Sequence, residues 1–305
     1  MTLRTRFQPQ QAHTRISVSE ENPCACRPRR MEWLVNHGIR LLLLGLALAY
    51  TKAVRAEETT PTSEQSEEEL AKEAQNPIAD LYSFPFQENI GLNYGPTKEV
   101  QNVLNFQPVI PIHAGPVNVI TRSIVPLVTN PSSVAGDGAT TGLGDINFSA
   151  FVSPAKPAAL TWGIGPALTF PTATSPLVGS QSTWGVGPTA VLLTMPGPWV
   201  IGLVTNVIFG IAGDGGDSFL LQYFVNYNFG GGWYVTTSPI ITAAWNLPNV
   251  SSGQWTVPFG AGFGKLQKFG QVPINFNLEA YWNAVRPDTL PSSSWTIRLQ
   301  LTLIL

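Results

Sequence analysis

Apolar and polar residues alternate along most of the chain after residue 87. The last run is the most regular, because every second residue from Trp295 to Leu305 is large and apolar, while most residues between them are polar. Alternation of period two over about ten residues is typical of a transmembrane β-strand. The pattern predicts strands over residues 88–95, 102–114, 117–129, 142–154, 160–173, 184–196, 199–211, 218–229, 233–246, 254–268, 271–285 and 295–305.

The connections between these predicted strands alternate in length. Short turns such as His113–Pro116 alternate with long ones such as Asn130–Thr141. Outer-membrane barrels have short periplasmic turns, longer outer loops and an even number of strands. We therefore expect an all-β fold, a transmembrane antiparallel β-barrel of about 12 strands over residues 88–305, with a short N-terminal helix or tail.

A soluble β-sandwich is the alternative fold, since it also has many short strands. The tryptophans favour the barrel, because they fall at or near the ends of the runs, where membrane barrels carry girdles of aromatic residues. No window after residue 56 is apolar for the length of a membrane-spanning helix, about twenty residues. The tryptophans concerned are Trp162, Trp184, Trp199, Trp233, Trp245, Trp255, Trp282 and Trp295.

Single prolines interrupt many of the predicted strands. Proline has no backbone N–H to donate to the ladder, so we expect bulges or local breaks at these positions. They are Pro108, Pro111, Pro126, Pro166, Pro188, Pro239, Pro258 and Pro273.

The first 56 residues resemble a leader. A basic residue precedes the apolar run Leu41–Tyr50, and the small residues Val54 and Ala56 follow it with the spacing of a signal-peptide cleavage site. We expect a leader and signal peptide over 1–56, with Met31 as the true start, and export to the bacterial outer membrane. An uncleaved anchor is the alternative. Both cysteines of the chain lie in this leader.

Residues 57–87 form an acidic segment ahead of the barrel. Eight acidic residues fall in Glu57–Asp80, where Lys72 is the sole basic residue. A capping box at Ser66–Glu69 predicts a short helix to about Gln75. The segment is either a disordered periplasmic tail or a partial plug folded into the barrel, the second reading resting on a cluster of apolar residues near its end.

Polar residues on the inward positions of the strands are the candidate functional residues. A charged group on the lipid side is costly, so the arginines and the glutamate among them belong inside. Twelve strands leave a narrow interior. These residues either line a solute path or tie the wall together. The lumen-lining candidates are Arg122, Asp145, Asn147, Asn226, Asn275, Asn277, Glu279, Arg298 and Gln300.

The sequence offers few residues that could form a catalytic or metal-binding site. After the leader the sole histidine is His113, at a predicted periplasmic turn, and a nucleophile system needs a histidine held by a third group. No cluster of metal ligands is evident, and no cofactor is expected. The chain has no basic stripe that would bind nucleic acid.

Several motifs resemble one family of bacterial outer-membrane barrels. They are Leu70–Asn89 (LAKEAQNPIADLYSFPFQEN), the turn Gly142–Asp145 (GLGD) and the strand openings WGIGP and WGVGP. Members are labelled as transporters of the MetA pathway of phenol degradation, and some are mislabelled neuromedin U. The resemblance covers about residues 70–305 and implies a porin-like barrel that takes up aromatic or other small compounds. This chain ends in Leu305, where such barrels commonly end in Phe.

These patterns together predict a channel or transporter for small molecules, aromatic or apolar ones included, in the outer membrane of a Gram-negative cell. Its expected partners are outer-membrane lipid, small solutes and the barrel assembly machinery. The alternative is a closed structural or envelope-interaction barrel without transport. An enzyme acting on lipid is disfavoured by the position of His113.

Overall fold

The computed structural model describes residues 67–134, 136–156, 158–213, 215–247, 254–287 and 289–305. The expected leader and the start of the acidic segment lie outside these residues. The strands are β1(Ser83–Tyr94), β2(Glu99–Phe106), β3(Val109–Ala114), β4(Val117–Asn130), β5(Thr140–Leu143), β6(Ile146–Pro154), β7(Leu160–Phe170), β8(Trp184–Thr194), β9(Trp199–Ala212), β10(Asp217–Gly230), β11(Trp233–Thr237), β12(Ile240–Trp245), β13(Gln254–Phe269), β14(Val272–Val285) and β15(Trp295–Ile304), preceded by one helix, α2(Glu67–Ala74).

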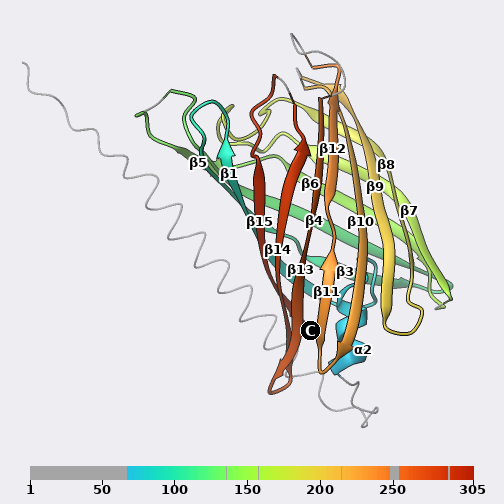
Figure 1. The fold of residues 1–305 in the computed structure, drawn as a ribbon. Helices are drawn as coiled ribbons and strands as arrows, with labels where there is room; N and C mark the ends of the chain where they lie inside the picture. Colours follow the sequence, from blue (N-terminus) through green and yellow to red (C-terminus); the bar gives the residue numbers. More distant parts are fainter. Residues whose placement is uncertain (1–66, 135, 157, 214, 248–253, 288) are drawn as a thin grey trace, which may run out of the picture. The chain divides into compact units, whose positions relative to one another are not determined.

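All strand segments belong to one antiparallel sheet that closes on itself (Figure 1). β15 pairs with β1, and β9 pairs with β10, so the ring has no free edge. The fifteen segments form twelve barrel strands, because β2 and β3, β5 and β6, and β11 and β12 are each one strand with a short interruption. The predicted twelve-stranded barrel is confirmed.

The barrel begins earlier than predicted. β1 starts at Ser83, whose register partner is Ile304, so residues 83–87 are wall rather than tail. Phe84 and Phe86 both pack against Phe106 of the neighbouring strand, with ring centroids 6.4 and 4.9 Å apart. The sequence pattern did not predict this half of the strand, because residues 84–86 are a proline between two aromatic residues and show no alternation of polar and apolar positions.

Prolines interrupt the wall at three of the expected sites. Pro108 lies between β2 and β3, and Pro239 lies between β11 and β12. Pro258 lies at a shift of register between β13 and β14. Pro111 and Pro273, in contrast, keep regular register with their neighbours, so a proline does not break the strand everywhere.

The repeated WGIGP and WGVGP segments lie side by side in β7 and β8, with Pro166 opposite Pro188. Their inner glycines permit close approach of the next strands. A Cβ on Gly165 would overlap the carbonyl oxygen of Ala150, and a Cβ on Gly187 would overlap that of Val207. Glycine in a strand marks such approaches, and here it lets the wall pack more tightly than any side chain would allow.

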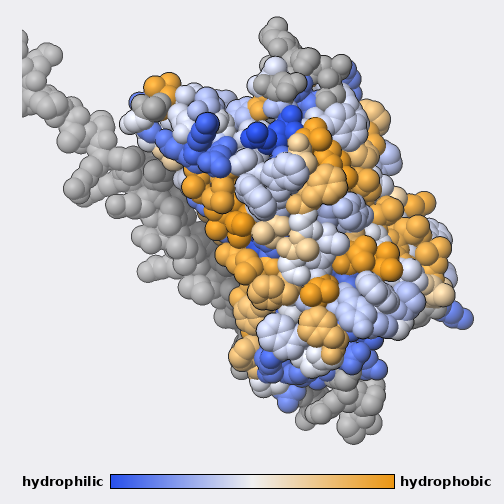
Figure 2. All heavy atoms as spheres, in the orientation of Figure 1, coloured by the Kyte–Doolittle hydropathy of each residue, from blue (hydrophilic) through white to orange (hydrophobic). Residues whose placement is uncertain are grey.

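The outer face of the wall is largely apolar and carries exposed aromatic residues near the strand ends (Figure 2). In this view the deepest blue lies near the two ends, with orange and pale residues between them. Three tryptophans lie at the end with the short turns, and five lie near the long loops, as expected for two girdles. The first set is Trp162, Trp199 and Trp233, and the second is Trp184, Trp245, Trp255, Trp282 and Trp295.

The N-terminal segment lies at the short-turn end of the barrel (Figure 1). The first turn of α2 is acidic, which suits the positive end of a helix dipole, and Lys72 pairs with Glu68 at 3.4 Å. Leu70 and Ala71 pack against inward residues of β13 and β15. Among the described residues no helix is long and apolar enough to cross a membrane.

After α2 the chain turns into the barrel interior. Ile78 is 5% exposed and belongs to a cluster of inward apolar residues on the β3, β4, β6, β8, β9 and β10 side of the wall. Hydrogen bonds tie the segment to the wall as well: Gln75 Nε2 donates to Asn228 Oδ1 at 2.8 Å, and Gln267 Nε2 donates to Glu67 Oε1 at 3.3 Å. The helix predicted here is thus present and docked.

We expect Gly165→Ala to lower the free energy of unfolding by about 1–3 kcal/mol, the usual cost of forcing extra volume into a packed site. Urea unfolding in lipid vesicles, followed by tryptophan fluorescence, measures this. Gly138→Ala is the matched control, because a Cβ there meets no atom within 4 Å. Equal stability of the two variants would contradict the close approach of β6 and β7.

Candidate functional site in the barrel interior

Three cavities adjoin one another inside the barrel. The basal cavity, about 1020 Å³ including space open to solvent, has the N-terminal segment as its floor. The upper cavity, about 1000 Å³, lies towards the long loops, and the lateral cavity, about 690 Å³, lies against β4, β6 and β9. Gln87 lines all three cavities, Arg298 lines the basal and upper ones, and Arg122 lines the basal and lateral ones. We call these three residues the central belt.

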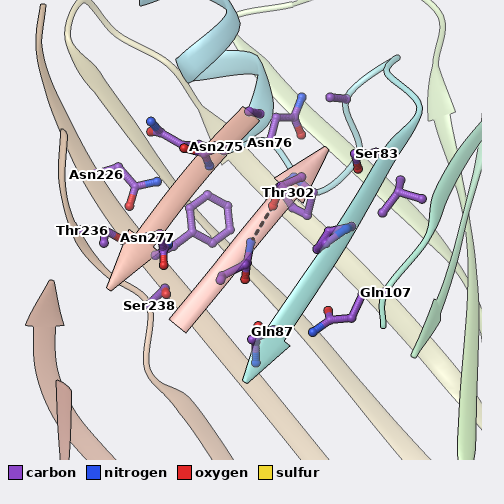
Figure 3. Close-up of a pocket in the computed structure, with 18 of the residues that line it drawn as sticks. Asn76, Ser83, Gln87, Gln107, Asn226, Thr236, Ser238, Asn275, Asn277 and Thr302 are labelled. Carbon is purple, nitrogen blue, oxygen red and sulfur yellow. Dashed lines mark hydrogen bonds between the residues drawn. The ribbon is translucent and has the colours of Figure 1, made fainter. Parts of the chain in front are cut away.

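The structure brings most of the predicted interior residues to one place. Seven of the nine line the basal cavity, and ten of the polar residues that line it are labelled in Figure 3. Asn147 lines the lateral cavity. The seven are Arg122, Asn226, Asn275, Asn277, Glu279, Arg298 and Gln300.

Asp145 has a different position. Its carboxylate accepts hydrogen bonds from the backbone N–H groups of Ala173 and Ser180, at 3.2 and 2.6 Å, and so holds the long connection between β7 and β8. The reason is the break in the wall at Gly144–Asp145, between β5 and β6, which interrupts the alternation on which its inward assignment rested.

Glu279 and Arg298 form a buried ion pair at the centre of the interior. They are register partners on β14 and β15, 2% and 5% exposed, and Arg298 Nη1 lies 3.0 Å from Glu279 Oε2. Glu279 also accepts hydrogen bonds from Asn277 Nδ2 at 2.7 Å and from the Tyr281 hydroxyl. The guanidinium lies 4.9 Å from the centre of the Tyr281 ring. A buried pair needs such extra partners to offset its desolvation.

The two proline breaks supply partners to the two arginines. Ser238, just before Pro239, accepts from Arg298 Nη1 through its carbonyl oxygen at 3.0 Å and its hydroxyl at 3.2 Å. Gln107, just before Pro108, accepts from Arg122 through its side-chain oxygen. Ser238 lies outside the registers of β11 and β12, so its carbonyl oxygen is available to a cation, while Gln107 uses its side-chain oxygen and donates its backbone N–H to the Pro85 carbonyl oxygen at 2.9 Å.

Sequence reasoning did not find Ser238, Gln107 or Gln87. The prolines that follow Ser238 and Gln107 could have indicated them. Each proline marks a position where the alternation of inward and outward residues is interrupted. Gln87 was assigned to the tail because the start of β1 was placed too late. All three line the basal cavity, and Gln87 and Gln107 are less than 7% exposed.

Two amide oxygens of the basal cavity are buried without a hydrogen-bond partner. They are Oδ1 of Asn226 and Oδ1 of Asn277, on β10 and β14. Asn226 as a whole is 5% exposed, and Figure 3 shows both side chains beside the cavity. Buried polar atoms nearly always have a hydrogen-bond partner, so these two oxygens are candidate acceptors for a donor group of a water molecule or a solute.

His113 lies at the end of β3, exposed, with Nε2 at 2.9 Å from Asp80 Oδ2. Asp80 belongs to the N-terminal segment and also accepts from Asn118 Nδ2 at 3.4 Å. This contact joins the segment to the rim of the barrel. Within the described ranges no group of three or more His, Cys, Asp or Glu side chains is placed to hold a metal ion.

Solved structures share the fold. The chain superposes on the crystal structure of the COG4313 outer membrane channel from Pseudomonas putida F1 with a TM-score of 0.56 and 14% identity, over 81% of this chain and 100% of that chain. Outer membrane phospholipase A from Escherichia coli gives 0.40 and 12% over 79% and 98%, and the CymD monoaromatic hydrocarbon channel gives 0.38 and 9% over 78% and 90%. No protein-family model and no curated protein matches the chain.

The first of these matches places the chain among barrels of the outer-membrane type by fold. At 14% identity this match shows the fold and no residue roles.

Glu279→Leu is expected to lower the free energy of unfolding by about 3–5 kcal/mol, because it leaves Arg298 buried without its counter-charge. Adding Arg298→Met should recover most of that loss, since both charges are then gone. Urea unfolding of the two single variants and the double variant gives the coupling energy. Additive losses would contradict the ion pair as one cooperative unit.

Proposed function

We propose that this protein is an outer-membrane channel for small molecules, with residues 67–82 as an internal plug at its periplasmic end. The observation that carries the proposal is the run of three polar-lined cavities meeting at the central belt, with the N-terminal segment as the floor of the lowest. A barrel built for structure alone has no need of a hollow, hydrogen-bonding interior.

The outer face supports a location in the membrane. An apolar wall between two rings of tryptophan matches the thickness profile of a bilayer, in which aromatic residues prefer the interfaces. Export through a signal peptide cleaved after Ala56, assembly by the barrel machinery and short turns in the periplasm belong to the same proposal. Its partners are then membrane lipid and small solutes.

The plug is held by contacts that can open separately from the barrel. Hydrogen bonds fix the segment at two points, from Gln75 to Asn228 and from His113 to Asp80, while Ile78 packs inside. None of these contacts is part of the strand ladder. Withdrawal of the segment would therefore leave the wall intact and open the basal cavity. His113, in this arrangement, is a tether rather than a catalytic base.

Planar-bilayer conductance tests the proposal. The chain from Glu57 to Leu305 should give small or rare current steps, and removal of residues 57–81 should give larger, long-lived ones, because β1 begins at Ser83 and remains whole. Silence of both folded proteins would favour the alternative, a closed structural barrel without transport.

A disulfide gives a sharper test that does not depend on deletion. Gln75→Cys combined with Asn228→Cys should fix the plug when a short bis-methanethiosulfonate cross-linker joins the two thiols through reducible disulfides, because the native side chains meet at 2.8 Å but two cysteines are shorter, and residues 57–305 contain no other cysteine. We expect conductance of the cross-linked double variant to rise on reduction. Gln75→Cys alone is the control and should show no redox response; a cross-linked double variant that conducts fully would contradict the plug.

A further inference from the structure

The geometry points to a binding site for a small hydroxylated organic carboxylate in the basal cavity, with Arg122 as the anion partner and Asn226 and Asn277 as acceptors for the hydroxyl. This inference deepens the proposed function and rests on it, because it names the solute that such a channel would hold on its way through.

The first argument is the difference between the two arginines. Arg298 has a counter-charge and further acceptors: it pairs with Glu279 and donates to Asn89 and Ser238. Arg122 has one neutral partner, Gln107, and no carboxylate among the described residues lies within ion-pair distance of it. A guanidinium has five N–H donors in a fixed fork, so most of the fork of Arg122 is available to a ligand.

The second argument is charge. The barrel strands contribute three charged side chains to the basal cavity, Arg122, Arg298 and Glu279, and the N-terminal segment contributes Glu73. The ion pair cancels two of the strand charges and leaves one positive charge on the wall, located on Arg122. A wall with one guanidinium that has no carboxylate partner among the described residues is complementary to a monoanion, and a carboxylate matches the fork with two parallel hydrogen bonds. A dianionic phosphate would lack a second cation.

The third argument comes from the unpartnered amide oxygens. Oδ1 of Asn226 and Oδ1 of Asn277 line the same cavity as Arg122 and accept no hydrogen bond. An acceptor in a buried site selects a ligand that carries a donor, because binding a ligand without one leaves the oxygen unsatisfied. A hydroxyl group at the far end of the carboxylate ligand supplies that donor.

The apolar part of the lining defines the body of the ligand. Val204 and Phe224, on β9 and β10, are buried at 5% and 6% exposure and face the same cavity. Ligand sites combine apolar walls with a few convergent polar groups. The site thus suits a compact apolar body with a carboxylate at one end and a hydroxyl at the other.

Calorimetric titration of the folded chain in detergent micelles, with its N-terminal segment in place, tests the site with three probes. We expect 4-hydroxybenzoate to bind about tenfold more tightly than 4-hydroxybenzamide, its neutral isostere, because the amide lacks the charge-assisted pair. Benzoate, without the hydroxyl, should bind about three- to tenfold more weakly than 4-hydroxybenzoate. Equal affinity for the acid and the amide would overturn the proposal.

Variants separate a binding role from a structural one. Arg122→Gln should abolish the preference for acid over amide by weakening binding of the acid far more than binding of the amide, and Arg122→Lys should keep part of the preference, since it retains the charge without the fork. Arg286→Gln, at an exposed arginine after β14, is the matched control and should keep the full preference. An Arg122→Gln protein that still prefers the acid would sink the assignment.

Conductance of the same samples keeps the two proposals apart. If the barrel binds the acid selectively but does not conduct even without its plug, the binding site is supported and the proposed channel function is contradicted. A conducting barrel that binds acid and amide alike would keep the channel and overturn the site.

Discussion

The ladder between β1 and β15 joins the first and last strands of the barrel, and the interior depends on it. It runs without a shift from Ser83↔Ile304 to Leu92↔Trp295, so it fixes which residues of both strands face inward. Closure removes the free edges that an open sheet would expose. It also places Asn89 of the first strand within reach of Arg298 on the last strand. Closure thus adds a partner from β1 to the ion pair that β14 and β15 form between them.

Departures from regular strand geometry position polar groups around the two interior arginines. The ladder is interrupted before Pro108 and before Pro239, and the residue preceding each proline turns its acceptor to an arginine. The acceptors differ, because Ser238 offers its backbone carbonyl oxygen, outside the registers of β11 and β12, and Gln107 offers its side-chain oxygen. Two defects of the sheet thereby convert a simple alternating wall into one with specific hydrogen-bonding positions, a common association of irregular strands with functional sites.

The interior is divided between two kinds of surface. Buried apolar residues cluster on one side, from β3 around to β10, together with Ile78 of the N-terminal segment. Amide, hydroxyl and charged groups line the side from β11 to β1, and Arg122 on β4 and Asn226 on β10 add polar groups to the apolar side. An interior with apolar and polar walls suits solutes that carry both characters, and in the proposed channel the segment beneath it would control their passage.

The sequence determined the class of fold, the number of strands and most inward positions, because the two-residue period of a strand is a local property that alternation records directly. It also identified Arg122, Glu279 and Arg298 as interior residues, since the lipid side excludes charge. Tertiary structure alone decided that Arg298 is paired and Arg122 is not, that Asp145 holds a loop, and that the N-terminal segment folds inside. Those outcomes depend on which strands meet across the barrel and on where prolines release the ladder, and no local pattern encodes distances between residues so far apart in the chain.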